Sequence, residues 1–130
     1  IASALAQQGR GAGARVLILG LTFKENVPDL RNSRVIDIIN ALTGRGFDVD
    51  VHDAFADTGE AKHEYNVDLL PSLDDAAGYH CVVGAVSHEA YAGYGAADLA
   101  KLLVEDGVVA DVKGMWRGLE LPESYRRWQL

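Results

Sequence analysis

The residues best suited to bind an anionic ligand lie in one stretch, residues 20–33, which reads GLTFKENVPDLRNS. Lys24 offers a point charge for a phosphate, and Arg31 offers a planar fork that Asp29 can hold in place. Backbone amides at the start of a following helix, near Ser33, would add partial positive charge. This set suits a diphosphate, and it equally fits a solvated lysine, a surface ion pair and a helix cap.

A second basic pair lies nearer the end of the chain, where Lys113 and Arg117 flank the sequence Gly-Met-Trp. A basic pair beside an aromatic ring could contact a phosphate and a base. Trp116 could equally pack into the core, which is the commoner role of a tryptophan. Phe23 is open to the same two interpretations, stacking or core packing.

We assign no catalytic role to any residue of the chain. The single cysteine, Cys81, lies in an apolar run, where a free thiol usually behaves as a small buried hydrophobe, so we expect a structural role. The four histidines show no metal-ligand spacing, and we predict no metal site. His88 follows a predicted strand and is the one histidine that could contact a ligand, although we expect it at the protein surface.

The glycines are wrongly placed for a dinucleotide site. The fingerprint G-x-G-x-x-G must follow the first strand, so that the backbone cradles a pyrophosphate at a helix N-terminus. Here the glycines of residues 9–13 precede the first apolar run, and residues 20–33 lack the spacing. We therefore expect no nicotinamide cofactor on this chain, and a free-standing NAD-binding protein is disfavoured.

Short apolar runs alternate with stretches of helical periodicity. The run RVLILG at residues 15–20 is typical of a strand buried on both faces. Ser33 is a good N-cap for the helix that follows, and Gly44 and Gly46 are typical of its end. We predict strands at residues 15–20, 47–52, 80–86 and 108–112, helices at 34–43, 73–77 and 96–104, a short helix or loop at 54–66, and a packing extension after residue 113.

Strands that alternate with helices indicate an α/β fold, a doubly wound parallel sheet in a single domain. Ligands bind such sheets beyond the carboxyl ends of the strands, where the strand order reverses. This rule selects four loops as the ligand-binding edge: residues 20–33, 52–58, 84–90 and 111–117.

The bulk composition limits the classes of partner. The chain has 130 residues, a formal net charge of −7 and ordinary hydrophobic content, which fits one globular domain. A nucleic acid or an anionic membrane would need clustered Lys and Arg, so we expect neither as a partner. A single cysteine and the absence of a signal-peptide pattern favour a cytoplasmic protein.

The first nine residues, IASALAQQG, resemble the last turns of a longer helix. We therefore divide the chain into residues 1–12, the end of a linker helix and a hinge, and residues 13–130, a ligand-binding domain.

The stretch at residues 20–33 resembles the signature that opens the C-terminal domain of the UDP-glucose/GDP-mannose dehydrogenase family. The runs VIDIINAL at 35–42, VDVHDAFAD at 49–57, AVSH at 85–88 and DVKGM at 111–115 resemble the same domain. They look most like the branch that acts on UDP-N-acetylglucosamine and UDP-N-acetylgalactosamine. Many relatives have Ser-Pro at the position where Ser33 is followed by Arg34.

The resemblance implies a Rossmann-like domain that binds the UDP part of a substrate. It also implies that NAD and the catalytic cysteine belong to other parts of an oligomeric enzyme, which oxidises the sugar C6 alcohol to a carboxylate for polysaccharide biosynthesis. Cys81 matches no position of the catalytic motif, so we expect this chain alone to be inactive. The resemblance and the loop chemistry together give the candidate substrate-binding residues Phe23, Lys24, Arg31 and Lys113, and the loop-supporting residues Asp29 and Ser33.

A second hypothesis stays open, in which the domain is chiefly an oligomerisation or regulatory module of that enzyme. It rests on the expectation that the aromatic segment from Trp116 to Trp128 is exposed, because exposed apolar patches mark interfaces.

Overall fold

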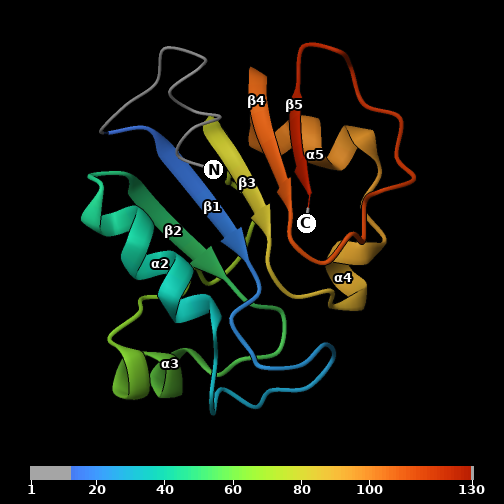
Figure 1. Ribbon diagram of the computed structural model, residues 1–130. Helices are drawn as coiled ribbons and strands as arrows, with labels where there is room; N and C mark the ends of the chain where they lie inside the picture. Colours follow the sequence, from blue (N-terminus) through green and yellow to red (C-terminus); the bar gives the residue numbers. More distant parts are fainter. Residues whose placement is uncertain (1–12, 130) are drawn as a thin grey trace.

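The computed structural model describes residues 13–129, and the predicted end of a linker helix at residues 1–12 lies outside this range. Five parallel strands form one sheet in the order β2-β1-β3-β4-β5 (Figure 1). This confirms the predicted α/β, doubly wound, Rossmann-like architecture. The elements are β1 (Arg15–Leu19), α2 (Val35–Gly44), β2 (Asp48–His52), α3 (Thr58–Tyr65), β3 (Tyr79–Gly84), α4 (Glu89–Ala92), α5 (Ala96–Leu102), β4 (Leu103–Asp111) and β5 (Arg126–Gln129).

The central strand β1 shows why its sequence is apolar throughout. Val16 and Ile18 belong to the core cluster that also contains buried residues of α2 and α3. Leu17 and Leu19 belong to the cluster on the opposite face, with buried residues of α4 and α5. Successive side chains of a strand point to opposite faces, so a strand between two helical layers buries both sets. Figure 1 shows the two pairs of helices on either side of the sheet.

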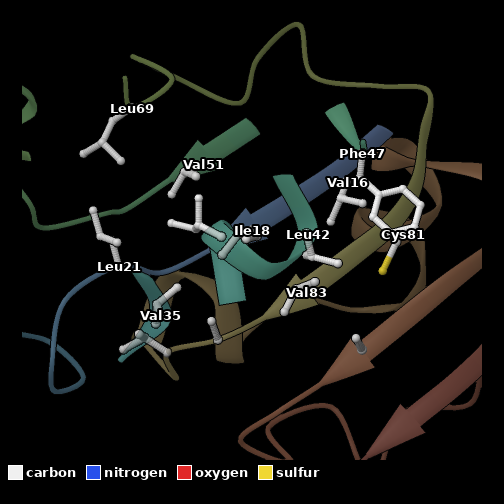
Figure 2. Packing of buried hydrophobic residues seen from close by; sticks show 14 of the residues in the cluster. Val16, Ile18, Leu21, Val35, Leu42, Phe47, Val51, Leu69, Cys81 and Val83 are labelled. Atoms are coloured by element: carbon white, nitrogen blue, oxygen red, sulfur yellow. The ribbon is translucent and has the colours of Figure 1, made fainter. Parts of the chain in front are cut away.

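Helix α2 packs on the sheet through the apolar stripe that the sequence predicts. Its buried residues Val35, Ile39 and Leu42 are spaced by four and three positions, which places them on one face of the helix. Figure 2 shows Val35 and Leu42 in the cluster that also contains Ile18 of β1 and Cys81 of β3.

The strand order creates a switch point at the carboxyl edge of the sheet. From β1 the chain moves first to β2 on one side, and later to β3 on the other side. The loops that leave β1 and β3 therefore diverge, and such a point is where doubly wound sheets bind ligands.

Several predicted elements differ from the structure. The helix predicted at residues 96–104 ends at Leu102, and Leu103 already begins strand β4. Residues 73–77 form a turn rather than a helix, closed by the Ala76 amide on the Leu73 carbonyl at 3.1 Å. Five residues are too few to repay the cost of starting a helix without strong packing. The tail expected to be a packing extension contributes a fifth strand, β5, which pairs in parallel with β4.

Within the described residues, the helices are too short and insufficiently apolar to cross a membrane.

Candidate functional site

A buried carboxylate, Asp53, joins two of the predicted ligand-edge loops. Asp53 directly follows β2, and its Oδ2 accepts the backbone amides of Leu21 at 2.6 Å and Thr22 at 3.0 Å. Its Oδ1 accepts the amides of Phe55 and Ala56, both at 2.8 Å. The carboxylate therefore fixes the start of loop 20–33 against its own loop.

His88 brings in the third loop. Its Nε2 lies 3.0 Å from Oδ2 of Asp53 and 3.1 Å from Oγ1 of Thr22, and the side chains of Asp53 and His88 are both 0% exposed. Nδ1 of His88 accepts the backbone amide of Asn26 at 2.8 Å. Because Nδ1 accepts, the proton of the neutral ring lies on Nε2, which donates to the carboxylate.

The environment of Asp53 stabilises its ionised form. Burial alone would raise the pKa of this carboxyl, but the hydrogen bonds from His88 and from the amides of Leu21, Phe55 and Thr22 hold the pKa well below its usual range. The expectation that His88 lies at the surface is therefore wrong. The buried carboxylate needs a hydrogen-bond donor inside the protein. His88, in the loop after β3, supplies that donor.

A pocket of about 230 Å³ opens beside this cluster, at the switch point. The loop after β1, the residues just after β3, the segment after β4 and the start of α2 all contribute to its wall. The lining residues are Thr22, Phe23, Arg34, Val35, Ile38, Ala85, Val86, Val112 and Lys113. Two of them are cationic and none is acidic, so the lining is suited to an anion.

Two of the four candidate substrate-binding residues, Phe23 and Lys113, line this pocket. Phe23 is 45% exposed, which is unusual for a large apolar side chain without a ligand or partner. Lys24 and Arg31 are exposed residues of the same loop and are not among the lining residues.

Asp29 and Arg31 pair with each other on the loop surface. The guanidinium donates from Nε and Nη2 to the two carboxylate oxygens, both at 3.0 Å, and the Arg31 amide also donates to Asp29. These bonds hold the pKa of Asp29 at about 2. The Arg31 side chain remains 85% exposed.

The prediction that Ser33 caps helix α2 is wrong. The helix begins at Val35, its N-cap is Arg34, and no side chain makes a capping hydrogen bond. The Ser33 hydroxyl instead donates to the Leu21 carbonyl. This hydrogen bond joins the two ends of loop 20–33. The next residue, Arg34, lines the pocket.

A second buried carboxylate, Asp111, organises the segment that carries Lys113. Asp111 accepts the amides of Met115 at 3.0 Å and Trp116 at 2.9 Å, which folds the chain into a turn after β4. Trp116 is 0% exposed, and its indole donates to the Tyr91 carbonyl at 2.8 Å. The expectation of an exposed aromatic segment is therefore wrong at Trp116, and Trp128 is partly buried against the core.

Cys81 is a core residue. It is 0% exposed, and burial raises the pKa of its thiol to about 12, so the reactive thiolate is scarce at neutral pH. Within residues 13–129, no three or more His, Cys, Asp or Glu side chains are grouped so that they could hold a metal ion.

The position that ends β1 requires a glycine. Gly20 has a φ of +105°, and a Cβ at this position would lie 2.5 Å from Cβ of Val86. The segment after β3 therefore approaches the backbone of Gly20 too closely for any side chain to fit.

Sequence reasoning missed Asp53 and the side chain of Arg34, and it considered His88 only as an exposed residue that could contact a ligand. Asp53 directly follows β2, and His88 lies four residues after the end of β3, so both are in loops at the edge that the fold rule selects, and this position was the available signal. Their pairing joins positions 53 and 88, which no local pattern connects.

The fold and this edge define a class: an α/β, doubly wound domain with a pocket at its switch point whose charged lining residues, Arg34 and Lys113, are cationic. A family model described as "UDP-glucose/GDP-mannose dehydrogenase family, UDP binding domain" matches residues 17–118. The chain belongs to this family.

The similar proteins agree with the family and with the predicted branch. The chain is 42% identical over 118 residues to Protein CapL of Staphylococcus aureus, which covers 91% of the chain and 27% of that protein. It is 41% identical over 101 residues to a UDP-N-acetyl-D-glucosamine 6-dehydrogenase of Pseudomonas aeruginosa, covering 78% of the chain and 24% of that protein. The chain thus spans about a quarter of the length of these relatives.

Solved structures show the same fold. An NDP-N-acetyl-D-galactosaminuronic acid dehydrogenase from Methanosarcina mazei superposes with a TM-score of 0.78 at 21% identity, over 96% of this chain and 26% of that one. A UDP-D-ManNAc dehydrogenase from Pyrococcus horikoshii superposes with a TM-score of 0.77 at 17% identity, over 96% of this chain and 28% of that one.

Proposed function

We propose that this chain binds the UDP portion of a nucleotide sugar in the pocket at the switch point. It would do so as the C-terminal domain of an NAD-dependent UDP-sugar 6-dehydrogenase. The substrate class that we favour is a UDP-N-acetylhexosamine, because the relatives above 40% identity include an enzyme named for one.

The observation that carries the proposal is the charge of the pocket wall. The chain has a formal net charge of −7, yet the pocket is lined by Arg34 and Lys113 and by no acidic residue. The first turn of α2 adds the partial positive charge of a helix N-terminus, because its first amides have no partner inside the helix. A concentration of positive charge in an acidic domain is what a diphosphate requires.

The lining residues divide naturally between the parts of the ligand. Arg34 and Lys113 would meet the diphosphate, and the exposed ring of Phe23 would cover the uracil or the ribose. Lys24 and Arg31 would act mainly by attraction through solvent, with Asp29 and Ser33 keeping their loop in shape. Their individual contributions to affinity would then be small.

For the whole enzyme we propose the chemistry that the family resemblance implies. NAD would be held by another domain and would accept hydride as the sugar C6 alcohol is oxidised, while the reacting thiol also lies outside this chain. This domain would contribute binding and orientation of the substrate, so the chain alone would be inactive. A homo-oligomeric, cytoplasmic enzyme remains the expectation.

Calorimetric titration of the chain with UDP, UMP and uridine tests the proposal. We expect UDP to bind more tightly than UMP, and uridine to bind most weakly, because each lost phosphate removes contacts with the cations. Arg34→Ala and Lys113→Ala should each weaken UDP binding by about tenfold, the value of one charge-assisted hydrogen bond.

A matched control comes from helix α3. Lys62 pairs with Asp68 at 3.1 Å and does not line the pocket, so Lys62→Ala changes the net charge equally and should leave UDP affinity within about twofold. Equal losses in all three variants would mean that only net charge matters, and the pocket assignment would then be wrong.

A further inference from the structure

Asn26 lies outside the pocket and connects the middle of loop 20–33 to the segment that follows β3. Its backbone amide donates to Nδ1 of His88, and its side-chain Oδ1 accepts the amide of Glu89 at 2.8 Å. Asn26 therefore contacts two successive residues after β3. It does so with a φ of +60°, a left-handed conformation that asparagine tolerates better than most residues.

These contacts bracket the pocket residue Phe23. Before it, Thr22 is held by Asp53 and donates from Oγ1 to the Lys24 carbonyl at 2.9 Å. Phe23 itself donates its amide to the Asp29 carbonyl at 3.0 Å, which closes the loop on itself. The loop that presents Phe23 thus has one fixed point at Asp53 and a second at Asn26.

We propose that Asn26 and His88 form a positioning latch, which holds loop 20–33 in the shape that presents Phe23 to the ligand. The latch sets ligand affinity without touching the ligand, because a loop already held in its binding shape loses less conformational entropy on binding. This inference deepens the proposed function and rests on it.

Asn26→Gly tests the side-chain half of the latch with little risk of unfolding. Glycine adopts positive φ freely, so the backbone can keep its path while the contact with Glu89 is lost. We expect the Phe23 amide to exchange its hydrogen about tenfold faster in the ligand-free chain, and UDP to bind about fivefold more weakly. The melting temperature should change little.

The chain provides a matched control and a rescue. Asn32 lies in the same loop with a φ of +59°, and Asn32→Gly should leave both the Phe23 exchange rate and UDP affinity within about twofold. Asn26→Asp keeps an oxygen that can accept the Glu89 amide, so it should bind UDP nearly as well as the natural chain.

Two substitutions of His88 separate its two nitrogens. His88→Asn places an acceptor near the Nδ1 position, and His88→Gln places a donor near the Nε2 position. If the latch is correct, the Gln variant loses the Asn26 contact and shows the faster Phe23 exchange, whereas the Asn variant retains slow exchange.

The outcomes separate this proposal from the proposed function. Failure of the natural chain to bind UDP would overturn the function and, with it, the effect of the latch on affinity, while the exchange rates would still decide whether the latch holds the loop. If UDP binds, and Asn26→Gly matches the natural chain in both affinity and Phe23 exchange, the latch is wrong. Faster exchange with unchanged affinity would overturn its positioning role.

Discussion

Two acid–base pairs serve the same loop, and their separations are equal. Nε2 of His88 and Oδ2 of Asp53 lie 3.0 Å apart, as do Nη2 of Arg31 and Oδ2 of Asp29. The first pair has no exposed side chain, whereas the Arg31 side chain is 85% exposed. Distance alone therefore does not say what a pair contributes to the fold.

The two carboxylates differ in the surroundings of the hydrogen-bond donors that would lose their acceptor if the carboxylate were removed. Asp53 accepts four backbone amides in addition to His88. The amides of Leu21 and Thr22 and the His88 side chain are buried, so in the absence of Asp53 water could not replace their hydrogen bonds. The partners of Asp29 are at the surface, where water replaces a lost hydrogen bond at little cost. The buried pair thus stabilises the loop and the junction of three chain segments, and the exposed pair adjusts only the loop surface.

The largest expected effect is the loss of the buried carboxylate. Asp53→Ala should lower the free energy of unfolding by about 3 to 5 kcal/mol, because it leaves His88 and the buried amides unpaired. Urea unfolding, followed by circular dichroism, measures it. Asp57→Ala is the matched comparison, because Asp57 accepts a single amide, that of Glu60 at the start of α3, and should cost about 1 kcal/mol. Equal losses would remove the distinction between the two environments.

An intermediate effect concerns acid stability. The folded pKa of Asp53 lies below its unfolded value of about 3.9, so the unfolded chain binds more protons near pH 4. Stability from this group is present above that pH and is lost as the pH falls toward the folded pKa. Asp53→Asn cannot titrate, so the dependence of its unfolding free energy on pH should be shallower between about pH 5 and pH 2.

The control for this measurement is Asp29→Asn. Asp29 also has a lowered pKa, about 2, but its carboxylate is exposed and its pairing is screened by salt. At about 0.15 M salt the Asn variant should therefore keep nearly the full pH dependence of the natural chain. A larger change at Asp29 than at Asp53 would contradict the comparison.

The smallest effect is expected at Arg31. Arg31→Ala should change the free energy of unfolding by less than about 0.5 kcal/mol, because the pair that it breaks is exposed. A double-mutant cycle with Asp29→Ala, measured by thermal unfolding, isolates the coupling between the two side chains. A coupling above about 1 kcal/mol would contradict the small contribution that we assign to this exposed pair.

Local sequence patterns predicted the frame of the molecule well. Continuous apolar runs predicted β1 and β3, and helical periodicity predicted α2, which buries Val35, Ile39 and Leu42 on one face. The alternation of strands and helices then selected the edge of the sheet at which the pocket lies. These features depend on the periodicity of apolar residues, which can be read from a short continuous stretch of the sequence.

The same reasoning was less reliable for individual contacts. The Ser33 hydroxyl could cap a helix or join the two ends of a loop, and only the position of the Leu21 carbonyl decides between these. The tail after residue 113 lacks a strong strand pattern, yet residues Arg126–Gln129 pair with β4 because its edge offers free hydrogen-bonding groups.

The sequence by itself determined the class of fold, the buried faces and the edge at which we propose that a ligand binds, because each follows from the order and spacing of residue types. Only the tertiary structure decided that Asp53 and His88 meet, that Arg34 and Lys113 share a pocket wall, and that Trp116 is buried. The physical reason is that parallel strands bring together loops that are far apart in the chain. Which partner a buried polar group binds therefore depends on how these loops lie next to one another at the edge of the sheet.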